Sequence, residues 1–224
     1  MYEKLKRQFP YYYSNNPSPF FDSREFDYEY SPISYEDMYG SEFIRRNPGA
    51  LLFYSASTGN GATARLDAGG NYSYVSGLSG FGRWTHVVGT ANGGLLFYDA
   101  STGNAATARL DANGKYYYVS SLSGFGTDWT HIVSAHENDL LFYSASTGNV
   151  ATARLDAGGN YSYVSGLSGF GRWTHVAGTA SGGLLFYNAS TGNAATARLD
   201  ANGKYYYVSS LSGFGTDWTH IEGV

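Results

Sequence analysis

The chain has 224 residues, a formal net charge of −4, no cysteine and 30 glycines, and aromatic residues make up 17% of it. Without cysteine it can form neither disulfides nor thiolate metal sites, and its scattered basic residues do not suit a nucleic acid partner. No apolar run approaches the length of a membrane-spanning helix, and glycine with aromatic residues favours short strands joined by tight turns.

Residues 1–50 form an N-terminal extension that is rich in aromatic residues and proline. All five prolines and both methionines lie there, with eight tyrosines and five phenylalanines. So aromatic a segment is not typical of a free tail, and two roles stay open: a segment that docks on the rest of the chain or on a partner, or an unstructured tail. It lacks the apolar stretch of a secretory signal, which predicts a chain made in the cytoplasm and leaves signal-independent export open.

Residues 51–224 consist of four tandem repeats, at 51–94, 95–139, 140–183 and 184–224. The string LLFY begins each repeat and is followed by ASTGN, ATARLDA, a Tyr-rich segment, LSGFG and WTH. The first and third repeats read GRWTH where the second and fourth read GTDWTH. The repeats therefore form two pairs in an ABAB arrangement.

Each repeat predicts four short antiparallel strands. In the second repeat these are residues 95–100, 106–110, 116–120 and 129–133. Asn113-Gly114 suits the positive φ values of a tight hairpin turn, the ASTGN stretch connects the first two strands in the same way, and no window has a helical apolar period. The repeats contain no proline, so every backbone N–H group in them is available for hydrogen bonds within the sheets.

Units of this size cannot bury their apolar faces alone, so the repeats must pack on one another. A β-trefoil needs three copies, and a solenoid needs parallel coils that hairpin turns do not give. The expected fold is therefore all-β, a β-propeller of four-stranded antiparallel blades with four blades. We expect residues 218–224 (WTHIEGV) to supply the inner strand of the first blade and latch the ring; residues 42–46 are the alternative strand.

The Trp-containing segments carry a resemblance to a known family. Gly82–Val87 (GRWTHV) and Gly126–Ile132 (GTDWTHI) are each followed by a turn and an apolar-aromatic strand such as Leu95–Tyr98. This pattern resembles the blades of the tachylectin and tectonin class of β-propeller lectins over residues 51–224, although tachylectin has five blades. The resemblance implies a multivalent sugar-binding protein with glycans as partners and one equivalent site per blade or blade pair.

Every repeat also supplies residue types that suit carbohydrate, whose C–H faces stack on aromatic rings and whose hydroxyls need fixed polar partners. Three sets of candidate ligand-binding residues follow: Trp84, Trp129, Trp173 and Trp218; the loop residues Asn60, Asn104, Asn149 and Asn193; and Arg65, Arg109, Arg154 and Arg198. Each set has a structural alternative. The tryptophans can fill gaps between blades, the asparagines can form turns, and each arginine can pair with the aspartate two residues later, on the same strand face.

The histidines that follow the tryptophans are His86, His131, His175 and His220, and they could line a pocket or the central channel. Their spacing matches no metal motif, so neither a metal nor a cofactor is expected. An active site needs distinct groups whose pKa values are driven apart, whereas near-identical blades repeat every group, so we expect no enzyme. Two functions stay open: a multivalent lectin, and an assembly module in which residues 1–50 dock onto a partner or a neighbouring subunit.

Overall fold

The computed structural model describes residues 49–223. The roles expected for the N-terminal extension, and the alternative strand at residues 42–46, lie outside the described residues. Within them, no helix is long and apolar enough to cross a membrane.

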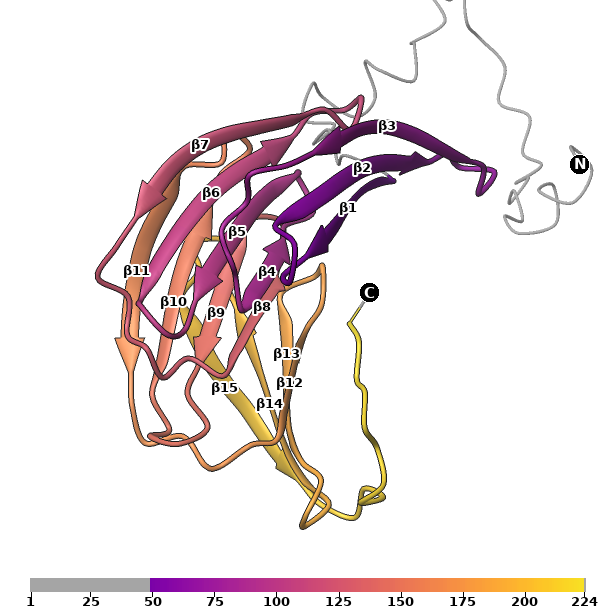
Figure 1. Cartoon of the computed structure of the whole chain (residues 1–224). Coiled ribbons are helices and arrows are strands. Elements are labelled where there is room, and N and C mark those ends of the chain that lie inside the picture. The colour runs from indigo at the N-terminus through magenta and orange to yellow at the C-terminus, as the bar shows by residue number, and fades with distance from the viewer. Residues whose placement is uncertain (1–48, 224) are drawn as a thin grey trace, which may run out of the picture. The chain divides into compact units, whose positions relative to one another are not determined.

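The described residues form four antiparallel sheets, each a meander that follows chain order (Figure 1). The first sheet contains β1 (Ala50–Ser55), β2 (Asn60–Leu66) and β3 (Tyr72–Leu78). The second contains β4 (His86–Gly89), β5 (Gly94–Asp99), β6 (Asn104–Leu110) and β7 (Tyr116–Leu122). The third contains β8 (His131–Ala135), β9 (Asp139–Tyr143), β10 (Val150–Leu155) and β11 (Tyr161–Leu167), and the fourth contains β12 (His175–Gly178), β13 (Gly183–Asn188), β14 (Asn193–Leu199) and β15 (Tyr205–Leu211). The prediction of an all-β fold with four propeller blades in this chain is confirmed, and the first blade has three strands among the described residues.

Each four-stranded blade takes its inner strand from the preceding repeat. β4 follows Trp84 of the first repeat but pairs with β5 of the second, so that His86 lies opposite Tyr98 and Gly89 opposite Leu95. The inner strands β4, β8 and β12 lie side by side in that order. The repeats therefore interlock, because the end of one is a strand of the next blade.

The hairpin turns between the last two strands of each blade are held by an aspartate. In the second blade Asp111 Oδ1 accepts the backbone N–H groups of Asn113 and Lys115, at 2.8 and 2.9 Å. Gly114 has a φ of 75°, whereas Asn113 has no positive φ. The turn thus forms where the sequence predicts it, with glycine alone in the left-handed region.

The LLFY strands of the second and third blades are fully buried because neighbouring blades cover both of their faces. Leu95, Leu96, Phe97 and Tyr98 are all buried, although successive side chains of a strand point to opposite sides. Leu96 and Tyr98 pack in a cluster with Leu140 of the next blade. Burying such a side chain contributes about 1.5–3 kcal/mol, so contacts between blades supply much of the stability.

The expected latch between the C-terminal segment and the first blade is not formed. Residues 218–223 are not a strand, and β1 pairs only with β2 among the described residues. The segment runs beside β12 instead, where the Nε2 atom of His175 lies 3.1 Å from the carbonyl oxygen of Thr219. The three junctions between blades have the same geometry, so the C-terminal segment lies beside β12 where the inner strand of a following blade would lie. In this position it does not pair with β1.

Candidate functional site

Three equivalent pockets lie between successive blades of the described residues. Each is bounded on one side by the linker that leaves one blade, which reads SGFGRW or SGFGTDW. On the other side lie a phenylalanine, an alanine and tyrosines of the next blade. The main lining residues are Phe81, Trp84, Phe97, Ala106, Tyr116 and Tyr118 in the first pocket; Phe125, Trp129, Phe142, Ala151, Tyr161 and Tyr163 in the second; and Phe170, Trp173, Phe186, Ala195, Tyr205 and Tyr207 in the third.

Hydrogen bonds to its backbone fix the linker in place, as the third pocket shows. The buried Tyr143 hydroxyl donates to the carbonyl oxygen of Gly171 at 2.6 Å and accepts the backbone N–H of Trp173 at 2.7 Å. The backbone N–H of Phe170 donates to the carbonyl oxygen of Gly148, in the ASTGN turn, at 3.0 Å. The final tyrosine of LLFY and the ASTGN turn therefore both position the pocket wall.

The aromatic rings in the pocket walls pack against one another. Phe170 and Tyr205 pack edge to face with their ring centroids 5.1 Å apart, and Trp173 and Phe186 are tilted with centroids 6.2 Å apart. A Cβ atom at Gly171 would lie 3.4 Å from the Trp173 indole, so the glycine backbone lies flat against that ring. Glycine and tryptophan at this spacing are thus parts of one wall.

The mouth of each pocket is open and carries an exposed tyrosine. Tyr118, Tyr163 and Tyr207 are 58%, 62% and 58% exposed. Gly169, on the rim of the third pocket, has a φ of 84° and would place a Cβ in open space. The pocket volumes are about 260, 270 and 310 Å³. The third is at the lower limit of the range of roughly 300–1,000 Å³ for small-molecule sites, and the other two are slightly smaller.

The pockets are of two kinds, which follow the alternation of the repeats. In the first and third pockets Tyr118 and Tyr207 each share a hydrogen bond of 2.7 Å with a serine, Ser121 or Ser210. In the second pocket Gly166 lies beside the Tyr163 hydroxyl, and the linker carries Asp128, which accepts a hydrogen bond from Thr147 at 3.1 Å. Burial raises the pKa of Tyr161 to about 12, so this tyrosine of the wall stays neutral.

Three of the four predicted tryptophans, Trp84, Trp129 and Trp173, line these pockets. Trp218 is 55% exposed and lines none of the three. The loop residues Asn60, Asn104, Asn149 and Asn193 are exposed outside the pockets, and each donates its backbone N–H to the threonine hydroxyl two residues earlier, at 3.3 Å.

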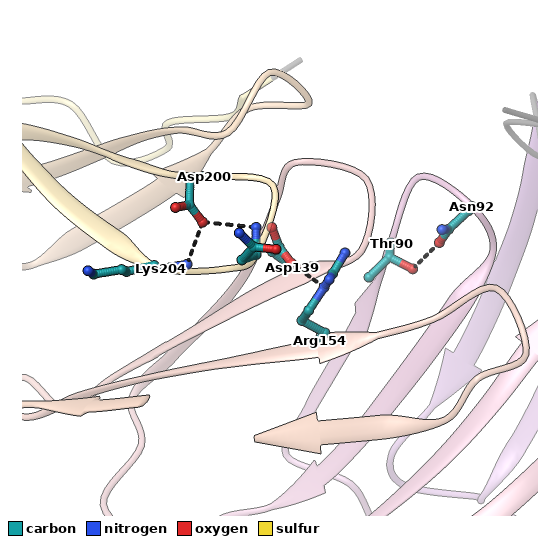
Figure 2. A network of polar contacts seen from close by, with 7 residues as sticks. Thr90, Asn92, Asp139, Arg154, Asp200 and Lys204 are labelled. Atoms are coloured by element: carbon teal, nitrogen blue, oxygen red, sulfur yellow. Dashed lines mark hydrogen bonds and ion pairs between the residues drawn. The ribbon is translucent and has the colours of Figure 1, made fainter. Parts of the chain in front are cut away.

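The predicted arginines also lie outside the three pockets. Arg109 and Arg198 stack over Tyr117 and Tyr206, with 4.3 and 4.6 Å from guanidinium carbon to ring centroid. Where the repeat has serine in place of that tyrosine, Arg154 Nε lies 3.2 Å from Asp139 Oδ1 (Figure 2). Arg65 Nε is buried without a hydrogen-bond partner among the described residues. The aspartates two residues after the arginines hold hairpin turns instead, at Asp67, Asp111, Asp156 and Asp200.

The histidines join neighbouring inner strands. The Nε2 atoms of His86 and His131 lie 3.3 and 3.0 Å from the carbonyl oxygens of Thr130 and Thr174, so each ring donates to the next blade. Burial lowers the pKa of His131, and the neighbouring histidines lower it further. Across residues 49–223, no group of three or more His, Asp or Glu side chains is placed to hold a metal.

Most of the pocket residues were not among those predicted from the sequence. The phenylalanine of the SGFG linker and the exposed tyrosine of the outer strand come from different blades, so no spacing along the chain relates them. The available signal was the repeated LSGFG string, since an aromatic residue between two glycines in every repeat has no part in a strand.

Comparisons with known proteins support the fold. No protein-family model and no curated protein matches the chain. One similar solved structure is a protein from Bacteroides fragilis named as a proposed 6-phosphogluconolactonase, with 12% identity and a TM-score of 0.52 over 74% of this chain and 52% of that one. A second, so named from Bacteroides uniformis, has 12% identity and a TM-score of 0.50 over 75% of this chain and 55% of that one. A third, a functionally unknown protein from Desulfotomaculum acetoxidans, has 10% identity and a TM-score of 0.50 over 74% of this chain and 56% of that one. The shared fold is a β-propeller. The chain spans little more than half the length of these structures, and the resemblance to tachylectin blades stays a prediction.

The names of two of these structures correct the expectation that the chain is no enzyme. Proteins named as lactonases share the β-propeller fold, so repetition of blades does not exclude catalysis. The symmetry argument failed because a fold of repeated blades can still place unlike groups together at one point of the ring.

Proposed function

We propose that this propeller binds carbohydrate, with one sugar ring in each pocket between successive blades. The observation that carries the proposal is the threefold repetition of one aromatic pocket, with a half-buried tryptophan and an exposed tyrosine in each. The sugar-related names of two structural neighbours agree with this class of ligand.

The chemistry of the walls suits a sugar ring. Sugars carry C–H faces that pack on aromatic rings, and Tyr118, Tyr163 and Tyr207 present faces to solvent at each mouth. Serine and tyrosine hydroxyls at the same places can exchange hydrogen bonds with sugar hydroxyls. Pockets of about 260–310 Å³ admit a single ring rather than an extended chain, so each contact is weak and branched glycans gain affinity through multivalency.

The two kinds of pocket predict two specificities. Asp128 stands beside the second pocket, whereas the linkers of the first and third carry arginine, at Arg83 and Arg172. A carboxylate accepts hydrogen bonds from sugar hydroxyls and disfavours anionic sugars, whereas arginine favours them. In a panel of monosaccharides, we therefore expect neutral sugars to bind in the second pocket and acidic sugars to bind in the first and third.

The test replaces the three exposed tyrosines together, Tyr118, Tyr163 and Tyr207, with alanine and measures binding by glycan array and calorimetry. Loss of one stacking contact of about 1.4 kcal/mol corresponds to a tenfold weaker affinity per pocket. The matched control carries Asn104→Ala, Asn149→Ala and Asn193→Ala in the exposed loops. If the asparagine variant loses binding while the tyrosine variant keeps it, the loops are the site and the pockets are not.

The ligand panel includes a sugar lactone, because two structural neighbours are named for such a substrate. Hydrolysis of a lactone releases an acid, so a pH-stat trace in the same experiment measures turnover. Turnover that depends on the three tyrosines places catalysis in the pockets. No binding of any member of the panel at millimolar concentration would overturn the proposed function.

A further inference from the structure

Each junction between blades has two halves. The linker half is the phenylalanine, glycine and tryptophan that leave one blade, and the receiving half is the LLFY phenylalanine with the alanine and tyrosines of the next blade. Where the halves meet, the receiving phenylalanines Phe97, Phe142 and Phe186 are each 1% exposed. The same junction is thus built three times within the described residues.

The first blade presents a receiving half with no linker half against it. Phe53, the equivalent of Phe97, is 49% exposed, and Tyr72 is 57% exposed. Its sheet also has three strands where the other sheets have four. The edge of β1 that an inner strand would occupy is therefore unpaired among the described residues.

The last repeat presents the matching linker half. Phe214 is 39% exposed and Trp218 is 55% exposed. The Phe214 ring packs on Tyr187 of its own blade at 6.2 Å, whereas Phe170 packs on Phe186 and Tyr205 of the following blade. His220, whose equivalents donate to the next inner strand, is exposed.

We propose that these two halves join between copies of the chain. The linker half of one copy packs on the receiving half of a second, and residues 218–223 pair with β1 as its missing inner strand. Phe214 and Trp218 of one copy then complete a fourth pocket with Phe53, Ala62 and Tyr72 of the other. Two such junctions close two chains into one ring, because a head-to-tail contact gives a ring wherever its rotation closes.

A second copy fits better than closure within one chain. The three existing junctions leave the C-terminal segment unpaired with β1 of the same chain, so closure within one chain needs a rearrangement of these blades. In the proposed assembly a second copy supplies the partner of each exposed half. Two copies give eight blades, within the usual range of about four to eight.

The repeat types agree with this assembly. The linker half at the end carries Asp217, as the second pocket carries Asp128. The receiving half carries Gly77 beside Tyr74, as that pocket carries Gly166 beside Tyr163. The fourth pocket is therefore of the second kind, and the alternation continues unbroken around the ring.

The test uses the full chain and two variants, Phe53→Glu and Trp218→Glu, each of which places a charge in one half of the junction. Light scattering after size-exclusion chromatography should give wild type twice the 24.3 kDa mass of one chain. Each variant alone should have the mass of one chain. An equal mixture should regain the doubled mass, since one junction between the two variants has both halves intact. Asn104→Glu, at an exposed side chain of the second blade that belongs to neither half of the junction, should keep the doubled mass.

Recovery in the mixture is the decisive result, because closure within one chain cannot be rescued by a second chain. A wild type with the mass of one chain overturns the proposal, as does a doubled mass that both variants retain. Neither outcome bears on carbohydrate binding by the three internal pockets, which are complete in one copy.

Discussion

Asp139 occupies a position where the second and fourth blades have glycine, at Gly94 and Gly183. Its side chain has no exposed surface, and Arg154 Nε lies 3.2 Å from Oδ1 (Figure 2). Burial raises the pKa of the Asp139 carboxyl, and Arg154 opposes this less strongly. The environment of Asp139 in the folded protein therefore favours the neutral carboxyl group over the charged carboxylate.

Asp139→Asn should stabilise the protein at neutral pH and leave it unchanged in acid. The folded pKa is raised above 3.8, so the destabilisation by ionised Asp139 is absent below that pH and grows as pH rises through the folded pKa. The variant should gain about 1 kcal/mol at pH 7, because an amide costs less to bury than a carboxylate and the Arg154 side chain, 36% exposed, stays hydrated without its partner. The gain is measured as unfolding free energy in denaturant from pH 3 to 7. Asp99→Asn is the control with the opposite sign, since hydrogen bonds from Ser101 and Thr102 lower the pKa of Asp99. A gain that does not change with pH would contradict the assignment.

His131 should make the protein less stable in mild acid. Burial lowers its pKa below 6.5, so the unfolded chain takes up the proton first, and stability falls as pH drops below 6.5 towards the folded pKa. His131→Gln should flatten the decline in unfolding free energy between pH 7 and 5. Asn104→Gln, at an exposed side chain that does not titrate, should leave the decline unchanged. Equal effects of the two substitutions would argue against burial of His131 as the cause.

At the scale of elements, each linker depends on one buried hydroxyl of the preceding blade. Tyr143→Phe removes the partner of both the Gly171 carbonyl and the Trp173 N–H. Leaving such groups unpaired should cost about 1–3 kcal/mol of unfolding free energy. Tyr118→Phe, which removes an exposed hydroxyl, should change stability by less than about 0.5 kcal/mol. Comparable losses in the two variants would mean that the linker is held by its aromatic contacts alone.

The ASTGN turns hold the same linkers through a close backbone contact. A Cβ at Gly148 would lie 2.3 Å from the Phe170 carbonyl oxygen, whereas a Cβ at Gly169 meets nothing within 4 Å. Both glycines have positive φ, so alanine at either should cost about 1 kcal/mol. Gly148→Ala should cost at least twice as much as Gly169→Ala in thermal unfolding, because the turn and linker must also separate. Equal costs would show that the contact relaxes freely.

At the scale of the whole molecule, the sequence predicted what is local and repeated. The period set the number of blades, and Gly114 and its equivalents set the turns. The pockets could not be predicted from the sequence, because Phe170 and Tyr205 come from different blades and meet only at the angle between them. That angle also explains why residues 218–223 do not pair with β1 of the same chain, although the sequence predicted this pairing for residues 218–224. The asparagines and arginines were predicted as ligand residues from their residue types alone. In the structure the asparagines lie in backbone turns, and two of the arginines stack on tyrosine rings.

If two chains close one ring, the stability of the molecule depends on its concentration. Association stabilises the folded state by mass action, so the midpoint of thermal unfolding of wild type should rise as protein concentration rises. Trp218→Glu removes the junction and should unfold at a midpoint that does not change with concentration. Wild type diluted below its dissociation constant should approach that value. Asn104→Glu should keep the concentration dependence of wild type, and a wild-type midpoint constant over a wide range of concentrations would argue against the two-chain ring.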